Sequence, residues 1–465
     1  MQEIEASARN DEAFEELYGV SDSLLERLKY ALENQEDHHD LRTITKDLHA
    51  ADFADLIEQL DHDLRIDLVQ KLGETIDSEV ISHLDYSIRL GLLKHLPLSK
   101  LALWIDALES DDAIDIIEDL SEEDQRNLLL LIPAEDRAVY EQGLSYLEDS
   151  AGRLMRKELV TIPNFWTVGQ TIDFLRTREH DEIPDDFYSL IIVGPHHKPV
   201  GLLKLSRLLV KPRYTAIAAI MDKEPKLIPV DLDQEDVAFL FQQYALLESP
   251  VVDEAGRLVG SITIDDIVDV IHEEHQEDML SMAGVQGNDY YSDIMRTIYS
   301  RSGWLLINLF TAIIASMVIG LFEQSLQQLV ALAILMPIVA SMGGNAGTQT
   351  LTVAVRALAT NTLTPSNAGK IILKETVVGG SNGVIFAMII GLIAWIWFDS
   401  AMLGLVIGLS MIINLLMAGL AGILIPIMLE YYGEDPAISS SIVLTTATDI
   451  IGFLSFLGLA SLLLL

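Results

Sequence analysis

The residues most able to do chemistry in this sequence are a few polar side chains within long apolar runs. Asp449 follows Thr445 and Thr448 in such a run near 438–464. A carboxylate at the centre of a bilayer costs about 3 kcal/mol or more on insertion scales, so its position there requires a partner or a function. The pattern favours a cation pathway. The alternative is a hydrogen-bonded structural acid at an interface between helices.

A second polar feature is the run from Pro337 to Gln349, PIVASMGGNAGTQ. A proline and three glycines predict an interrupted helix with freed carbonyl groups, which a membrane tolerates only where protein or water satisfies them. Such carbonyls would be ion ligands, together with Gly344, Asn345 and Thr348. The alternative is a kink whose small residues let helices pack closely. Asn414 and the corner at Asp435 and Pro436 are further candidates.

A third feature is a run of acids between 265 and 278. Like charges three or four residues apart destabilise a helix by about 0.2–0.5 kcal/mol per pair, so something is expected to neutralise them. One reading is a solvated linker. The other is that divalent cations, with Mg²⁺ best suited to carboxylates and water, bridge this helix to other acids of the soluble half. The residues concerned are Asp266, Asp269, Glu273, Glu274, Glu277 and Asp278, with Asp233 and Glu235 as possible partners.

Charge and hydropathy are segregated along the 465 residues. Asp and Glu number 70 against 30 Lys and Arg, for a net charge of −40, yet half of the residues are apolar. From Tyr299 onward there are only four basic and seven acidic residues, so nearly all the acid lies in the first 298 positions. Such a surface repels nucleic acid and attracts cations. The chain has no Cys, which excludes disulfides and thiolate sites.

Five apolar runs are long enough to cross about 30 Å of hydrocarbon. We place them near 303–322, 329–354, 377–398, 402–429 and 438–464, in a transmembrane domain over 299–465. The N-terminus has neither a basic region nor an apolar core of a signal peptide, so the soluble half is expected in the cytosol. The basic residues then fall on the cytosolic side, and the C-terminus lies outside. The plasma membrane is expected, or the inner membrane in a Gram-negative source.

The soluble half contains two kinds of repeat. After an acidic tail at 1–39, residues 40–135 hold similar stretches that begin at Leu60, Leu84 and Leu120, and ADLIEQL at Ala54 echoes IDIIEDL at Ile114. Helical spacing, with Ser121 and Asp124 placed as a capping box, indicates short stacked helices. From about residue 150 the pattern changes to alternating strands and helices. This region contains two copies of one sequence pattern, which match at offsets of 59 and 66 residues.

These two copies resemble a tandem pair of CBS domains, at 136–210 and 211–271. The second copy carries the closer match, PVVDEAGRLVGSITIDDI. That resemblance implies an adenosine nucleotide held by Thr263 and Asp266. Lys204 and Arg207 occupy the two equivalent places in the first copy, so at most one ordinary nucleotide site is implied, with ATP as its expected ligand.

Two catalytic motifs fail on their context. Gly379–Gly383 fits G-x-S-x-G but begins an apolar span, and no His follows Ser381, so we interpret it as a small-residue packing stretch. His272 and His275 are spaced by three residues, which does not meet the H-E-x-x-H geometry. An intramembrane aspartyl protease requires two buried acids, and Asp449 is the one carboxylate well inside a predicted span. No enzyme is expected.

Taken together, the acidic helical domain, the CBS pair, the acidic connecting helix and five spans with PIVASMGGNAGTQT and EDPAISSSIVLTTATDIIGFLSFLGLA resemble the MgtE magnesium channel family. The resemblance implies a homodimer in the lipid bilayer, a Mg²⁺-selective uptake pore near Asp449, and closure by a plug helix at 272–298 when cytosolic Mg²⁺ binds. The implied sensing acids are Asp233, Glu235, Asp266, Asp269, Glu274, Glu277 and Asp278, with Asp112 and Asp115 in the helical domain. An exchanger coupled to Na⁺ or H⁺ is the alternative, and the residues do not separate Mg²⁺ from Co²⁺, Mn²⁺ or Ni²⁺.

Overall fold

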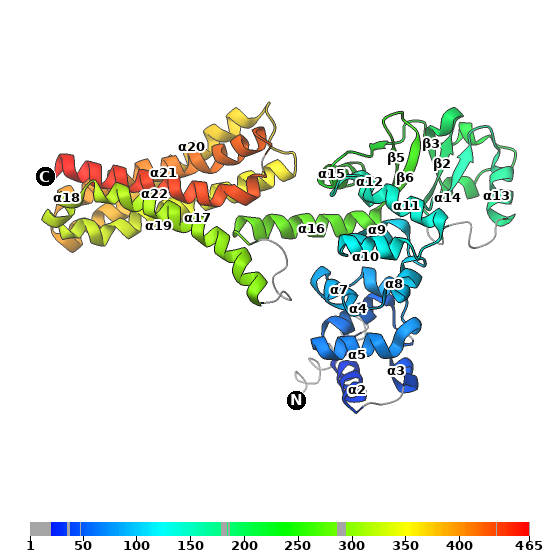
Figure 1. Ribbon diagram of the computed structural model, residues 1–465. Helices are drawn as coiled ribbons and strands as arrows, with labels where there is room; N and C mark the ends of the chain where they lie inside the picture. The colour runs from blue at the N-terminus through cyan, green and yellow to red at the C-terminus, as the bar shows by residue number, and fades with distance from the viewer. Residues whose placement is uncertain are drawn as a thin grey trace, which may run out of the picture. The chain divides into compact units, whose positions relative to one another are not determined.

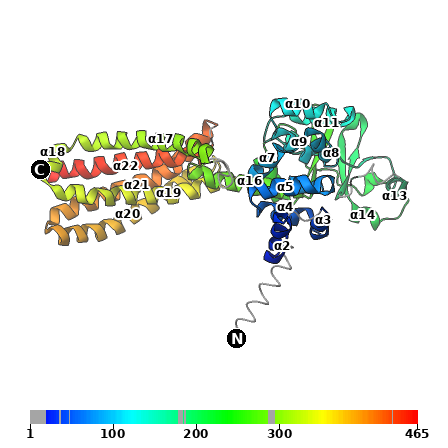
Figure 2. The ribbon, with the colours of Figure 1, turned by 60° about the horizontal axis from the view of Figure 1, so that its bottom comes forward.

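The computed structural model describes residues 20–34, 38–46, 48–177, 184, 187–285, 294–433 and 435–464. These residues fall into two compact units, 1–271 and 272–465, which we treat separately. Figure 1 labels most of the elements of both units, and Figure 2 gives a second view. Most of the predicted acidic tail, and residues 286–293 of the predicted plug helix, lie outside the described residues.

The N-terminal part of the first unit is a stack of short helices around one apolar core. It consists of α2 Asp22–Glu33, α3 His38–Thr45, α4 Ala50–Glu58, α5 His62–Leu72, η1 Gly73–Thr75, α6 Glu79–Ser82, α7 Tyr86–Leu93, α8 Leu98–Ile105, α9 Ser110–Glu118, α10 Glu122–Leu129 and α11 Ala134–Leu144. The predicted repeat is present, because α4 and α9 start 60 residues apart, as do α5 and α10. Ser121 caps α10 by accepting a hydrogen bond from Asp124 N at 3.2 Å.

This helical domain extends beyond both predicted limits. Leu28 and Leu32 of α2 are buried in its core, although the sequence reading placed them in a tail. At the other end, Tyr140 of α11 lies in the same core, and Gly143 abuts the side chain of Ile114. The apolar residues of α2 follow an amphipathic spacing that buries one face of the helix.

The rest of the first unit holds two small sheets of the same design. The first contains β1 Thr161–Pro163, β2 Ser189–Val193 and β3 Pro199–Lys204, and the second contains β4 Ile228–Pro229, β5 Glu248–Val252 and β6 Leu258–Thr263. In each sheet a parallel pair is followed by an antiparallel pair. The accompanying helices are α12 Ala151–Leu154, α13 Val168–Thr177, η3 Pro195–His197, α14 Leu205–Leu209, η4 Ile217–Ala219 and α15 Gln234–Tyr244.

The two copies exchange their leading segments. Met155 and Arg156 precede the first sheet but pack against Gly260 of the second, and Arg156 pairs with Ser261. Reciprocally, the segment at Met221 packs against Gly201 of the first sheet. Each glycine is needed because a Cβ there would lie within 3.0 Å of the incoming methionine. The copies therefore do not divide at residue 210, as the sequence reading placed them, but interlock.

The second unit consists of five long apolar helices and a short one. These are α17 Ile294–Gly320, α18 Glu323–Gln328, α19 Val330–Ala359, α20 Ala368–Phe398, α21 Ala401–Tyr431 and α22 Pro436–Leu463, and all but α18 are long and apolar enough to span a membrane. The predicted packing role of Gly379 is confirmed, because a Cβ there would meet the carbonyl oxygen of Leu415 on α21 at 2.6 Å. Small residues at such crossings let helix backbones approach closely.

The predicted interruption of α19 is wrong. The helix runs without a break through Pro337 and the three glycines to Ala359. Proline removes one backbone donor, which a helix in a bundle tolerates. Two of the glycines serve packing, since a Cβ at Gly343 would clash with Asn414 and one at Gly347 with Leu444. Gly344 has open space around it.

The acidic helix, α16, spans Ile264–Met282 and begins directly after β6. It ends where Gly284 adopts a left-handed conformation with φ of +71°, and Val285 N donates back to the carbonyl of Leu280 at 2.9 Å. This is shorter than the predicted plug over 272–298, because residues 294–298 belong to α17.

Candidate ion pathway and acidic cluster

One face of α19 carries a line of polar side chains that the rest of the chain leaves exposed. Its members, Ser341, Asn345, Thr348 and Thr352, follow one another at three- and four-residue steps. Thr348 Oγ1 donates to the carbonyl of Gly344 at 3.0 Å, and Thr352 Oγ1 to that of Thr348 at 2.9 Å. Each hydroxyl proton is therefore used within the helix, which leaves oxygen lone pairs to accept a hydrated cation.

A matching line runs along α22. Ser441, Thr445 and Asp449 lie four residues apart, and none of them is buried. Thr445 Oγ1 donates to the carbonyl of Ser441 at 2.9 Å, so it too presents an acceptor oxygen outward. The two helices pack at Gly347, where an added Cβ would lie 3.0 Å from Leu444 Cδ1. The predicted pore residues Asn345 and Thr348 on α19, and Thr445 and Asp449 on α22, thus belong to two helices that pack directly against each other.

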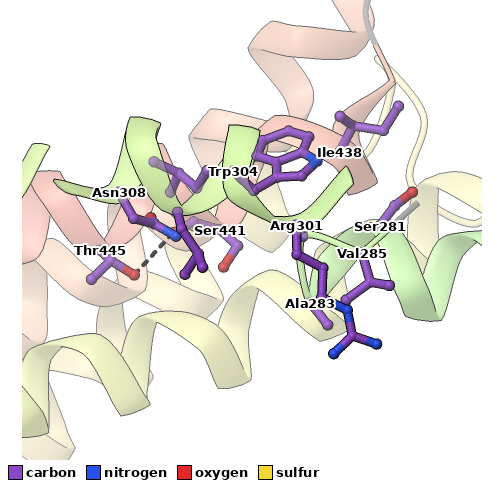
Figure 3. A pocket seen from close by; sticks show the side chains of 12 residues that line it. Ser281, Ala283, Val285, Arg301, Trp304, Asn308, Ile438, Ser441 and Thr445 are labelled. Carbon is purple, nitrogen blue, oxygen red and sulfur yellow. Dashed lines mark hydrogen bonds between the residues drawn. The ribbon is translucent and has the colours of Figure 1, made fainter. Parts of the chain in front are cut away.

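A cavity of about 460 Å³ lies at one end of this pair, between α17, α22 and the segment that follows α16. Thr445 and Ser441 of α22 face it together with Asn308 and Trp304 of α17, as Figure 3 shows. Ala283 and Val285, just after α16, line the same space. The residues that end the acidic helix therefore border the polar line of α22.

Two predicted acids meet close to this cavity. Asp435 caps α22 by accepting a hydrogen bond from Ala437 N at 2.7 Å. Burial, with the charge of Asp435 next in size, raises the pKa of Asp278 on α16. A carboxylate whose pKa is raised by burial and by a neighbouring negative charge marks a place where a divalent cation would be stabilised. Glu274 and Glu277 lie one turn or less away on the same helix.

The sequence reading missed a second buried acid in the membrane unit. Glu375 is 8 % exposed and lies within α20, whose first two turns extend the span beyond the predicted start at 377. The positive charges of Lys370 and Lys374 obscured this extension. The prediction that Asp449 is the one carboxylate well inside a span is therefore wrong, because Glu375 lies within α20 as well.

In the first unit, three acids gather where α9 meets the start of α16. Burial and then the charge of Asp266 raise the pKa of Asp112 to about 7, and burial raises that of Asp266 to about 6. The pKa of Asp111 is also raised well above its usual value by burial and by Asp266, and its Oδ1 is buried without a hydrogen-bond partner. Asp112 and Asp266 were predicted to act together. Asp111 was not among the predicted sensing residues, because its burial depends on which face of α9 packs inward.

Other acids around this cluster are paired with arginine. Arg156 is 3 % exposed and bonds to Glu109 at 2.6 Å. Arg89 is similarly buried and bridges Asp115 at 2.7 Å and Asp119 at 2.6 Å. Asp115, a predicted sensing residue, is thus engaged by a protein cation. We call Asp111, Asp112 and Asp266 the acidic cluster.

The remaining predicted residues are placed apart from this cluster or bonded locally. Asp233 caps α15 by accepting from Glu235 N at 2.9 Å, and its charge acts on Asp149. Thr263 Oγ1 donates to Asp266 at 2.8 Å, so the two predicted nucleotide ligands bond to each other. Asp269 is exposed on α16. Among the described residues, no three His, Asp or Glu side chains converge as a ready metal site.

Comparison with known proteins agrees with this arrangement of parts. Models of three families match: the divalent cation transporter MgtE at residues 336–459, the MgtE intracellular N domain at 48–149, and the CBS domain at 217–273. The magnesium transporter MgtE of Thermus thermophilus is 32 % identical over 96 % of this chain and 99 % of its own. The chain belongs to the MgtE family of magnesium transporters.

Further relatives extend this result. The magnesium transporter MgtE of Bacillus subtilis is 30 % identical over 91 % of this chain and 93 % of its own. A solved cytosolic domain of the Mg²⁺ channel MgtE in complex with ATP is 33 % identical, covering 52 % of this chain and 98 % of that one, with a TM-score of 0.48. The expectation of a multi-pass membrane protein with a helical domain and CBS regulatory domain is confirmed, and Mg²⁺ is the transported ion of the family.

Proposed function

We propose that this protein is a Mg²⁺-selective channel for uptake, closed by cytosolic Mg²⁺. One observation carries the proposal: α19 and α22, two packed helices that are long enough to span a membrane, each carry a line of polar side chains, and the line on α19 is exposed. In lipid, exposed polar groups at this depth are unfavourable unless protein or water covers them. A water-containing pathway along these two helices satisfies them.

A second copy of the chain supplies the missing cover. If two subunits face each other through α19 and α22, the polar lines enclose one pathway, and each contributes Asp449 to it. Two carboxylates and several outward hydroxyl oxygens suit a Mg²⁺ ion that keeps most of its waters. Conduction requires that such a site binds the ion without trapping it. Asn345, Gly344, Thr348, Thr445 and Asp435 are the other ligands proposed along the path.

Closure is assigned to α16 and the segment after it. Ala283 and Val285 border the cavity that Thr445 faces, and Asp278 lies near Asp435. Without Mg²⁺, repulsion between these carboxylates favours separation of α16 from the pore. Bound Mg²⁺ reverses the sign of the interaction and selects the closed state through its stronger binding there.

The same logic applies in the soluble unit. Asp111, Asp112 and Asp266 are brought together by the contact between the helical domain and the second CBS copy, and burial there raises the pKa of each. Mg²⁺ at this cluster would stabilise the contact. Asp233, Glu235, Asp269, Glu274 and Glu277 supply further negative charge for the sensor, and Asp115 is assigned a structural ion pair instead.

The orientation follows from the charges: N-terminal domains in the cytosol, the C-terminus outside, and the plasma membrane as location. ATP binding stays a prediction at Thr263 and Asp266, where a ribose would have to replace their mutual hydrogen bond. A carrier coupled to Na⁺ or H⁺ is the competing mechanism, and Co²⁺, Mn²⁺ and Ni²⁺ are competing ions.

The test is Mg²⁺ influx into liposomes that contain the purified protein, read by an internal dye while the Mg²⁺ on the cytosolic face is varied. We expect influx that falls as this Mg²⁺ rises and that needs no Na⁺ or H⁺ gradient. Asp449→Asn should abolish influx while the dimer still forms. Asp399→Asn is the matched control, because it removes the same charge from an exposed position at the end of α20. Normal influx through Asp449→Asn, or influx that requires a second ion gradient, would contradict the channel.

A further inference from the structure

The most unusual buried group in the membrane unit is the side chain of Asn414, midway along α21. It is 0 % exposed. Its Nδ2 donates to the carbonyl of Val339 on α19 at 2.8 Å, while its Oδ1 is buried and has no partner. A side chain of the same size without polar atoms, such as leucine, would avoid an unsatisfied buried acceptor. Stability alone therefore does not favour Asn at this position.

Asn414 also contacts both pore helices at positions where only glycine fits. A Cβ added to Gly343 of α19 would lie 2.2 Å from Asn414 Nδ2, and one added to Gly452 of α22 would lie 2.9 Å from the same atom. Real side chains do not approach so closely, so the two glycines exist as recesses for this amide. Gly343 is next to Gly344 and Asn345, and Gly452 follows Asp449 by three residues.

We propose that Asn414 is a positioning residue that sets the separation of α19 and α22, and thereby of the oxygen ligands on the two pore helices. The amide reaches α19 at Gly343 and α22 at Gly452, so one side chain contacts both pore helices. Its hydrogen bond to Val339 lies just after Pro337, the point at which α19 lacks a backbone donor. It therefore holds the part of α19 that leads into the polar line.

This inference rests on the proposed pathway through α19 and α22, and it makes a distinct prediction. A residue that acts only in packing would change stability and flux together. A positioning residue changes which ion passes, because selectivity depends on the spacing of ligands. Selectivity is therefore measured as the ratio of Mg²⁺ to Co²⁺ influx in the same liposomes, beside the thermal midpoint of the purified dimer.

Asn414→Leu is the principal variant. We expect a thermal midpoint equal to or above that of the parent, Mg²⁺ influx lower by about fivefold or more, the factor that corresponds to one hydrogen bond of ordinary strength, and an altered ion ratio. Ser410→Ala is the control, because Ser410 is also fully buried in α21 but bonds within its own helix, to Ile407 O at 2.8 Å. It should leave the ion ratio unchanged.

If Asn414→Leu does not fold, a second pair of variants tests the positioning role of Asn414. Gly343→Ala should lower influx and shift the ion ratio, and adding Asn414→Ala should restore part of both, since the clashing amide is then gone. An unchanged ion ratio in Asn414→Leu, or no recovery in the double variant, would overturn the proposal. If the parent protein itself carries no Mg²⁺, the proposed channel fails instead, so the two failures are distinguishable.

Discussion

Neutralising Asp112 should allow the helical domain to stay on the second CBS copy without Mg²⁺. Asp112 lies on α9, its carboxylate is partly buried, and the negative charge of Asp266 acts on it. Asp112→Asn keeps the size of the side chain but removes the charge. The variant should therefore be docked in metal-free buffer, where the parent protein is expected to separate, and should respond less to added Mg²⁺.

The magnitude follows from the pKa of Asp112. Burial and Asp266 raise that pKa from 3.8 to about 7. At about 1.4 kcal/mol for each tenfold change, keeping the carboxylate ionised in the docked arrangement costs about 4 kcal/mol relative to water. Part of this cost arises within the helical domain and is unaffected by docking. Even one third of this free-energy cost corresponds to about a tenfold change in the ratio of docked to separated molecules.

The assay uses a pair of spin labels and full-length protein. Because the chain has no Cys, two introduced cysteines are labelled without background. Leu130 at the end of α10 and Tyr214 in the first CBS copy suit this purpose, since they are 68 % and 85 % exposed. Labelled chains are diluted with unlabelled ones so that each distance is measured within one subunit. The distance distribution is then recorded as Mg²⁺ is titrated.

A matched control distinguishes the effect of removing a charge at position 112 from the effect of lowering the net charge of the domain. Asp63→Asn removes the same charge from an exposed position on α5 of the same domain and should behave like the parent. If Asp112→Asn separates as readily as the parent in metal-free buffer, or separates more readily, the cost assigned to its charge is wrong. An equal effect from Asp63→Asn would attribute docking to total charge rather than to the acidic cluster.

Three further outcomes are expected. The pKa values of Asp112 and Asp266 are raised to about 7 and 6, so the docked state binds more protons than the separated state. Metal-free docking should therefore increase as the pH falls from 8 to 6, and this pH dependence should disappear at saturating Mg²⁺. Docking that increases as the pH rises would contradict this prediction. Asp278→Asn should keep the channel partly closed at low Mg²⁺, seen as lower patch-clamp open probability. Gly419→Ala should destabilise the protein by about 1–3 kcal/mol in thermal unfolding, because its Cβ would lie 2.7 Å from Glu375 O, whereas Gly344→Ala should not.

Much of the fold could be predicted because repeats and apolar runs are local patterns that can be seen in the sequence alone. The 59- and 66-residue offsets predict two similar sheets, and run length predicts five spans. The exchange of leading segments could not be predicted, since Met155 and Met221 are equivalent in sequence and either sheet could accept either one. Similarly, the choice between an interrupted and a continuous α19 depends on what packs at Gly343 and Gly347, and those partners come from distant helices.

The sequence predicted that acidic residues form the site, but not which of them are paired with arginine and which are unpaired. In the described part of the soluble unit, arginine neutralises Glu109, Asp115 and Asp119, whereas no arginine or lysine forms an ion pair with Asp111, Asp112 or Asp266. We therefore expect the charge of the acidic cluster to oppose docking. A complete switch between two states requires about 5.5 kcal/mol of differential binding. Burial of a few carboxylates supplies an opposing term of this order, and the cation that removes it is the one that the protein transports. For the proposed sensor we therefore expect a threshold that depends on how many carboxylates the docked state leaves unpaired.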